Sequence, residues 1–270
     1  MLGDVTFGQY YNARSFLHKT DPRTKILLLI AYIVAVFLAQ NFLSLAAVLV
    51  FLIVAIIFSS VPLGSVLRSV KAIFFLILFM FVLNVLFHVR QEGETVYFWV
   101  ITKEGLISAS FLSARLILLV TGSSLLTLTT TPVSLTDGIE SLLKPLNLVK
   151  FPVHDLALVM SIALRFIPTL ANETDRIISA QKARGADFES GNIFSRIKAL
   201  VPVLIPLIIS ALRRADELGD AMDARCYSGS KVRTKYKKLR FTARDIAVFV
   251  AGAAMVAGVV LLRVYFPWNV

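Results

Sequence analysis

The sequence has little that could form covalent cross-links or catalyse a reaction. Among its 270 residues Cys226 is the only cysteine, which excludes an internal disulfide framework. The three histidines, His18, His88 and His154, are scattered and lack the spacing of metal ligands. No phosphate-binding loop of the form G-x-x-x-x-G-K-[ST] occurs, and no Ser/His/Asp constellation is recognisable. We therefore expect no catalytic residue, no metal and no cofactor, and any use of ATP would need a separate protein.

Apolar side chains, by contrast, are abundant. They make up 57% of the chain, whereas an ordinary soluble domain has nearer 45–50%. Yet 17% of the residues are charged and the net charge is +11, and each charge costs several kcal/mol at the centre of a bilayer. The charges must therefore be segregated from the apolar segments. This composition predicts an integral membrane protein.

Five apolar segments are long enough, or nearly so, to cross about 30 Å of hydrocarbon as helices. The first is short and would borrow residues from its flanks. The expected fold is all-α, with about five transmembrane helices in a multi-pass protein of the cell membrane. The segments are Ile26 to Ala39, Phe42 to Val61, Ala72 to Val89, Leu106 to Thr127 and Ile246 to Val264.

Lysine and arginine predict the orientation, because they accumulate in cytoplasmic loops. Four of them precede the first span, and Arg68 and Lys71 lie between the second and third, whereas acidic residues balance the loop from Arg90 to Lys103. The N-terminus is therefore expected in the cytoplasm. The predicted division is 1–131 for four spans, 132–240 for a cytoplasmic region and 241–270 for the last span. The basic run from Lys231 to Arg240 should contact anionic lipid rather than nucleic acid, because it adjoins a span.

The cytoplasmic region should contain one short and two long helices. Thr131-Pro132 is a good helix start, and Pro145 ends the short apolar pattern that follows. Longer helical patterns begin at Val153 and at Asn192, each apolar at first and charged later. The alternative is that both long helices cross the membrane, which would give seven spans and place their charged halves on opposite sides.

The two long helices end on similar tripeptides. These are Ala183-Arg184-Gly185 and Ala224-Arg225-Cys226. Arginine in a last helical turn is favoured locally, because it faces unpaired carbonyls and the negative end of the helix dipole. That local preference explains one such arginine. The pair also suits docking, because small neighbours leave each guanidinium exposed to acceptors on a partner.

Several motifs together resemble one family, the T component of energy-coupling factor vitamin transporters. The resemblance covers nearly the whole chain and implies that two cytosolic ATPases dock on the long coupling helices through Arg184 and Arg225. It also implies an integral, substrate-binding S component as a second kind of partner. Cys226 departs from the glycine that the family often has. The motifs are the two tripeptides, the D-P-R-T-K stretch from Asp21 to Lys25, the run from Leu126 to Leu146, and ALRFIPTL from Ala163 to Leu170.

Structural or interfacial roles are expected for six further residues. Asp21 should cap the first span, with Pro22 in its first turn and Arg23 at the interface. Arg115 lies inside the fourth span, where it would pair with a polar group of the bundle, dock toward the S component or contact substrate. Pro145 and Arg165 belong to the motifs quoted above.

Two other functions stay open. One is a T component dedicated to cobalt or nickel uptake. The other is a membrane-embedded enzyme acting on lipids, which would use the acidic residues Asp216, Asp220 and Asp223 on one helical face. Interleaved arginines favour a solvated or partner-facing surface for these three.

Overall fold

The fold is described from a computed structural model of the chain. It describes residues 10–11, 13, 15–87, 96–98, 101–149, 151–188, 192–227 and 241–265. The run from Lys231 to Arg240 and His88 lie outside the described residues, as does most of the loop from Arg90 to Lys103.

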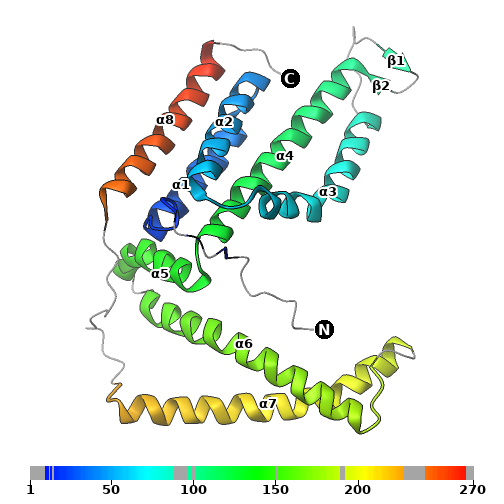
Figure 1. The fold of residues 1–270 in the computed structure, drawn as a ribbon, viewed down its shortest axis with the longest axis vertical. Helices are drawn as coiled ribbons and strands as arrows, with labels where there is room; N and C mark the ends of the chain where they lie inside the picture. The colour runs from blue at the N-terminus through cyan, green and yellow to red at the C-terminus, as the bar shows by residue number, and fades with distance from the viewer. Residues whose placement is uncertain are drawn as a thin grey trace. The chain divides into compact units, whose positions relative to one another are not determined.

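Helices dominate the described chain (Figure 1). A two-stranded antiparallel ribbon, with Val96 opposite Thr102, is the one departure that the described residues show from the expected all-α chain. The elements are α1 (Pro22–Leu38), α2 (Phe42–Ser59), α3 (Leu63–Leu86), β1 (Val96–Phe98), β2 (Ile101–Thr102), α4 (Lys103–Thr129), α5 (Pro132–Leu143), a 3-10 helix (Lys144–Val149), α6 (Val153–Ala183), α7 (Ile193–Ala224) and α8 (Ala243–Tyr265).

Five described helices are long and apolar enough to cross a membrane: α2, α3, α4, α6 and α8. Four of them match expected spans, and the fifth, α6, is one of the two long helices expected in the cytoplasm. The expected first span corresponds to α1, whose 17 residues extend only about 25 Å. Asp21 and Ala39, which flank α1, lengthen it only slightly.

The chain divides into two compact units. The bundle unit comprises residues 8–153 and 239–270 and holds α1 to α5 and α8. The two-helix unit contains α6 from His154 onward and α7. The short helix α5, expected within the cytoplasmic region, packs against α1 and so belongs to the bundle unit.

The core of the bundle unit lies between α1, α2, α4 and α8, and α3 packs along α4. Two glycines permit the close approach of α1 to its neighbours. A Cβ added at Gly122 would collide with the ring of Tyr32, and one added at Gly252 would lie 2.5 Å from the side chain of Leu28. The packing of α1 against α4 therefore depends on the absence of a side chain at Gly122, whereas at Gly252 the atom met is the far end of the flexible Leu28 side chain, which can turn aside.

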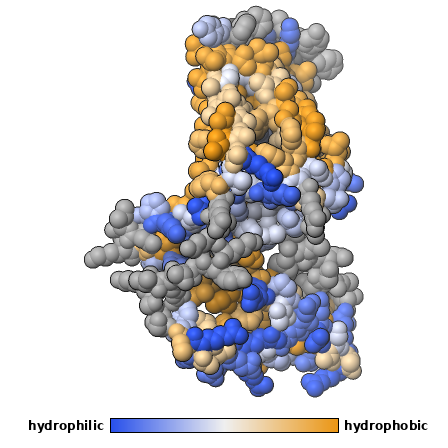
Figure 2. All heavy atoms as spheres, turned by 60° about the vertical axis from the view of Figure 1, so that its left-hand side comes forward, coloured by the Kyte–Doolittle hydropathy of each residue, from blue (hydrophilic) through white to orange (hydrophobic). Residues whose placement is uncertain are grey.

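The surfaces of the two units differ in character. Figure 2 shows that the visible face of the bundle unit is mostly hydrophobic, whereas much of the visible surface of α6 and α7 is hydrophilic. An apolar exterior suits a helical bundle in a membrane, because leucine and phenylalanine side chains that would be unfavourable in water are stable against lipid.

Candidate docking site

The end of α6 has a well-defined backbone geometry. The amide of Ala186 donates to the carbonyl of Gln181 at 3.0 Å, and the amide of Gly185 donates to that of Lys182 at 3.0 Å. This pair of bonds is a Schellman motif, in which the residue after the cap adopts the left-handed conformation. Gly185 does so, with φ of 89°. Arg184 is thus the last residue before the reversal of the chain.

The end of α7 repeats this geometry. The amide of Tyr227 donates to the carbonyl of Met222 at 3.0 Å, and the amide of Cys226 to that of Asp223 at 2.9 Å. Here the left-handed residue is Cys226, with φ of 58°. Helix α7 thus ends within the tripeptide Ala224-Arg225-Cys226, as expected from the sequence. Arg225 therefore occupies the same position in its motif as Arg184 does in the other.

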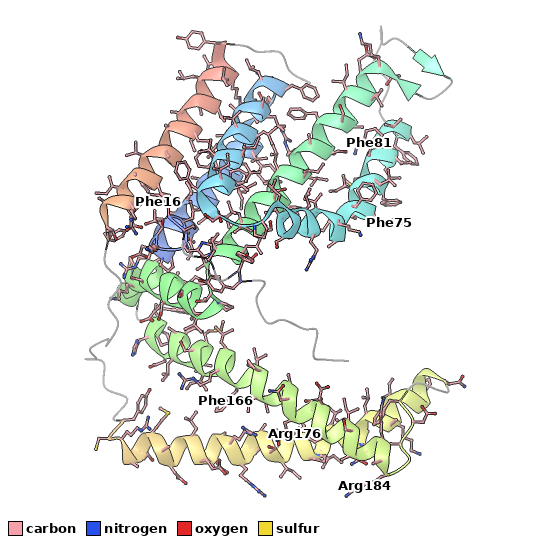
Figure 3. All side chains as sticks on the ribbon, viewed as in Figure 1. Phe16, Phe75, Phe81, Phe166, Arg176 and Arg184 are labelled. Carbon is pink, nitrogen blue, oxygen red and sulfur yellow. The ribbon has the colours of Figure 1, made fainter. Side chains whose placement is uncertain are left out.

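All six residues of the two tripeptides are exposed. Neither the guanidinium of Arg184 nor that of Arg225 makes a hydrogen bond or ion pair with another residue that the structure describes. Within the two-helix unit the two helix ends point in opposite directions, and Figure 3 marks Arg184 at the end of α6. The two-helix unit thus presents two similar cationic tips that are well separated.

Polar contacts hold α6 and α7 together where they meet. Arg214 of α7 donates to Glu173 of α6 at 2.7 Å, and the hydroxyl of Ser210 donates to the other oxygen of the same carboxylate. We call these three residues the crossing cluster. The sequence did not predict this cluster, because Ser210 and Arg214 lie 37 and 41 positions from Glu173 and no local pattern relates residues so far apart.

A second contact between these helices uses a backbone group that proline leaves free. Pro206 has no amide hydrogen, so the carbonyl of Pro202, four residues earlier, lacks its usual helical donor. The side chain of Gln181 donates to this carbonyl at 3.4 Å. The prolines inside α7 therefore provide an acceptor for α6.

In the bundle unit, one buried carboxylate joins the starts of two helices. Asp245 of α8 accepts from the amide of Asp21 at 2.7 Å and, through its other oxygen, from the amide of Thr242 at 2.7 Å. Asp21 in turn caps α1 by accepting from the amide of Arg23 at 2.9 Å, with Pro22 in the first turn as expected. Asp245 is only 1% exposed, and its bond to the amide of Asp21 is buried, whereas its bond to the amide of Thr242 is partly buried.

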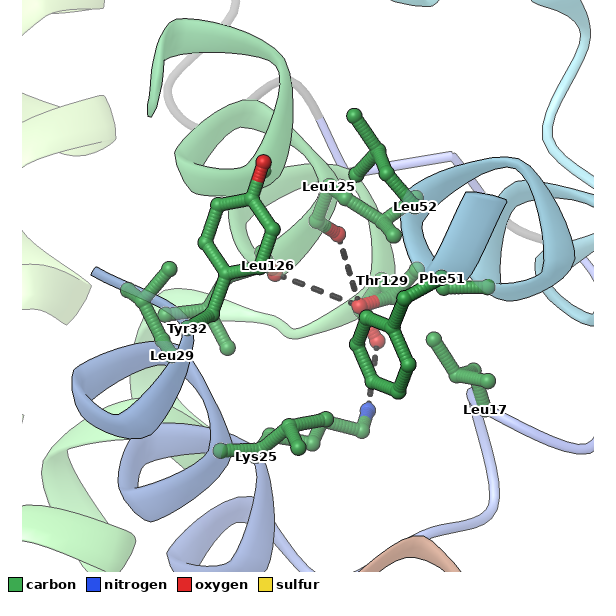
Figure 4. Close-up of a pocket in the computed structure, with 12 residues that line it drawn as sticks. Leu17, Lys25, Leu29, Tyr32, Phe51, Leu52, Leu125, Leu126 and Thr129 are labelled. Carbon is green, nitrogen blue, oxygen red and sulfur yellow. Dashed lines mark hydrogen bonds between the residues drawn. The ribbon is translucent and has the colours of Figure 1, made fainter. Parts of the chain in front are cut away.

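Lys25 brings a positive charge into the same region. At the end of α4 its Nζ donates to the carbonyl of Thr129 at 3.0 Å (Figure 4). It also donates to the hydroxyl of Thr130 at 3.2 Å. The first contact gives a hydrogen-bond donor to a carbonyl in the last turn of α4. The lysine also lies near the carboxylates of Asp245 and Asp21. Neither Lys25 nor Asp245 was singled out from the sequence, although the D-P-R-T-K stretch ends on this lysine.

Arg115 also contacts a helix end. One of its Nη atoms donates to the carbonyl of Ala39, the residue that caps α1, and its guanidinium lies 4.8 Å from the centre of the Phe111 ring. A backbone carbonyl of the bundle is thus one partner of Arg115. Arg23 lies beside Asp21 and over the ring of Phe241, Pro145 lies in the 3-10 helix after α5, and Arg165 is exposed on α6.

His18, in the turn before α1, bridges Ser15 and the carbonyl of Tyr11. Partial burial lowers the pKa of His18 below its usual range, and the bond to the Tyr11 carbonyl only partly offsets this effect. A neutral ring that donates through Nε2 to the carbonyl fits both contacts.

The acidic residues considered for an enzyme do not form a site. Asp216, Asp220 and Asp223 are exposed on α7. No group of three or more histidine, cysteine or acidic side chains suited to a metal occurs in the part of the chain that the structure describes.

The chain is similar to a well-defined group of proteins. A family described as "Cobalt transport protein" matches residues 13–236. The energy-coupling factor transporter transmembrane protein EcfT of Thermosediminibacter oceani is 48% identical over 270 residues, which cover 99% of this chain and 100% of that protein. The proteins of the same name from Clostridium kluyveri and Bacillus subtilis are 46% and 43% identical, over 98% and 97% of this chain and 99% and 100% of their own lengths.

Proposed function

The chain belongs to the family of energy-coupling factor transporter transmembrane proteins, the T components, and from this we propose that it couples ATP hydrolysis by two separate ATPase subunits to uptake of a vitamin. It is a multi-pass protein of the cell membrane and a transporter component rather than an enzyme. We propose three things beyond family membership: the coupling to ATP hydrolysis, the cargo and the identity of the partner subunits.

The observation that carries the proposal is the matched pair of tips. Two Schellman motifs place Arg184 and Arg225 at equivalent backbone positions, exposed and without a described partner. One kind of ATPase, present twice, could hold both arginines through the same groove, because the local geometry around each is alike. Guanidinium groups bind carboxylates and carbonyls through a rigid fork, which suits a contact that must transmit movement.

In this proposal the N-terminus and both tips lie in the cytoplasm, and α6 and α7 stay on that side of the membrane. Although α6 is long and apolar enough to span, its second half carries Glu173, Asp175 and Arg176. If both helices crossed the bilayer, the two tips would lie on opposite sides. A cytosolic motor could then reach only one of them.

The apolar halves of α6 and α7 are proposed to contact an integral S component that binds the substrate. Several large apolar side chains on these halves are exposed, and they offer a surface that a membrane partner could cover. Movement of the tips would shift this surface and so change the S component's orientation or its hold on the vitamin. The exposed large apolar residues there are Leu156, Val159, Met160, Leu200, Val201, Leu204, Ile205, Ile208 and Ile209.

The test replaces Arg184 and Arg225 with alanine, singly and together, and measures how much ATPase co-purifies and how fast vesicles take up vitamin. Loss of a central interface arginine commonly costs 2 kcal/mol or more, so we expect recovery of the ATPases to fall by at least about ten-fold in the double variant. Arg213→Ala is the matched control, because Arg213 is exposed on α7 but lies away from the tip. Full ATPase recovery and full uptake in the double variant would refute the proposal.

A second cargo is favoured by one observation, the description of the matching family as a cobalt transport protein. Uptake of radiolabelled vitamins and of labelled cobalt or nickel, measured in the same cells with and without this chain, separates the two. Dependence of metal uptake alone on the chain would assign it to the metal transporters.

A further inference from the structure

The first turns of α3 carry two cations in a helix that is otherwise almost entirely apolar. Arg68 and Lys71 are three residues apart and therefore share one face, and both are exposed. α3 is long and apolar enough to span the membrane. The charges thus lie near the beginning of a helix whose remainder suits hydrocarbon.

The two cations lie in an open groove. Gly64, Leu67, Arg68, Val70, Lys71 and Phe74 line it. Its apolar walls remain uncovered, since Leu67 is 63% and Phe74 59% exposed, and a Cβ added at Gly64 would meet no atom within 4 Å. The opposite face of the helix packs into the bundle through Val66 and Ile77, so the groove opens away from the protein.

No acidic side chain in the described ranges pairs with these two cations. Neither the guanidinium of Arg68 nor the ammonium of Lys71 makes an ion pair or hydrogen bond with any other residue there. In a spanning helix such charges are costly unless they reach the headgroup level, where they find phosphate. Arginine binds a phosphate through two parallel donors, and a lysine one turn away can reach the same group.

The geometry points to a binding site for one anionic phospholipid, its phosphate held between Arg68 and Lys71 and an acyl chain lying along Leu67 and Phe74. Two positive charges without a counter-charge favour a headgroup of net negative charge over a zwitterionic one. The apolar walls favour a lipid over a soluble phosphate. Figure 3 shows the neighbouring Phe75, which is 79% exposed, on the outer side of α3, and it extends the apolar surface next to the groove.

The site is tested by native mass spectrometry of the full chain purified in detergent and titrated with phosphatidylglycerol or phosphatidylcholine. We expect retention of phosphatidylglycerol in preference to phosphatidylcholine. The Arg68→Gln, Lys71→Gln double variant should bind phosphatidylglycerol about twenty-five-fold more weakly, because each charge at headgroup level contributes about a factor of five. Arg263→Gln, which removes an arginine from the far end of α8, is the matched control and should bind as the unaltered chain does.

Further variants separate the lipid site from other outcomes. Arg68→Lys keeps the charge and the fold, so it should retain most of the binding. Leu67→Ala with Phe74→Ala should weaken phosphatidylglycerol binding without affecting any binding of inorganic phosphate.

Equal retention of both lipids, or unchanged binding in the double glutamine variant, would overturn the inference. So would displacement of the lipid by millimolar phosphate, which would identify an anion site without lipid specificity. ATPase recovery does not enter these measurements, so the proposed coupling function stands or falls separately.

Discussion

Cys226 holds a left-handed backbone conformation that glycine holds at the matching end of α6. A side chain at positive φ costs about 1 kcal/mol or more, because its Cβ crowds the following carbonyl. We expect Cys226→Gly to strengthen the cap of α7 by about 1 kcal/mol and to slow amide hydrogen exchange in its last turn about five-fold. Cys226→Ser keeps the strain and serves as the control; if both variants exchange at the same rate, the strain is not present.

Asp245 is expected to stabilise the bundle unit, because it accepts hydrogen bonds from two backbone amides. An asparagine side chain at this position would keep one oxygen as an acceptor. Its NH2 group would face the other backbone N–H, from which the carboxylate now accepts a hydrogen bond. One of the two backbone amides would lose its partner, at a cost of about 1 kcal/mol or more. Asp245→Asn should therefore lower the thermal unfolding midpoint of the purified protein by several degrees, whereas Asp223→Asn, on the exposed side of α7, should leave it unchanged. Equal midpoints for the two variants would show that Asp245 does not tie the helix starts together.

The crossing cluster links α6 to α7 where the two helices meet, and we expect it to set how far apart their tips are. Glu173→Arg or Arg214→Glu alone would place like charges where the helices meet, and combining both restores opposite charges. Spin labels at Ala183→Cys and Ala224→Cys, in a Cys226→Ser background, report the distance between the tips. We expect each single exchange to broaden the distance distribution and the double exchange to narrow it again. The pair is partly exposed, so screening by solvent should keep the effect of each charge small. A double exchange as broad as the singles would argue that the charges do not set the crossing.

Local sequence signals were sufficient for most elements. Asp21-Pro22 and Thr131-Pro132 predicted the starts of α1 and α5, and both aspartate and threonine accept the expected capping bonds. The two long patterns from Val153 and Asn192 correspond to α6 and α7. The short β ribbon was not foreseen, because strands of three and two residues have too few positions to show alternation.

The buried polar contacts could not be predicted in the same way. Asp245 and Asp21 are 224 positions apart, and Lys25 and Thr129 are 104 apart. Such pairs are formed by the packing of helices, and one sequence carries no record of which helices meet.

The single cysteine allows two properties of the chain to be tested together: the side of the membrane on which the end of α7 lies, and the docking of an ATPase there. Cys226 is exposed and directly follows Arg225. If this tip is cytoplasmic, a membrane-impermeant maleimide should label Cys226 in inside-out vesicles but not in right-side-out ones. If an ATPase holds Arg225, the bound subunit should protect the thiol, and labelling should rise when the ATPases are stripped from the membrane.

The control for this last experiment moves the thiol along the same helix. In the Cys226→Ser, Arg213→Cys variant the thiol lies about 20 Å from the tip, since each helical residue rises about 1.5 Å. Labelling there should show the same sidedness but much less protection. Labelling of Cys226 from outside the cell would place the tip where no ATP-driven subunit could reach it. Equal labelling with and without bound ATPases would mean that the exposed guanidinium of Arg225 is not a docking point.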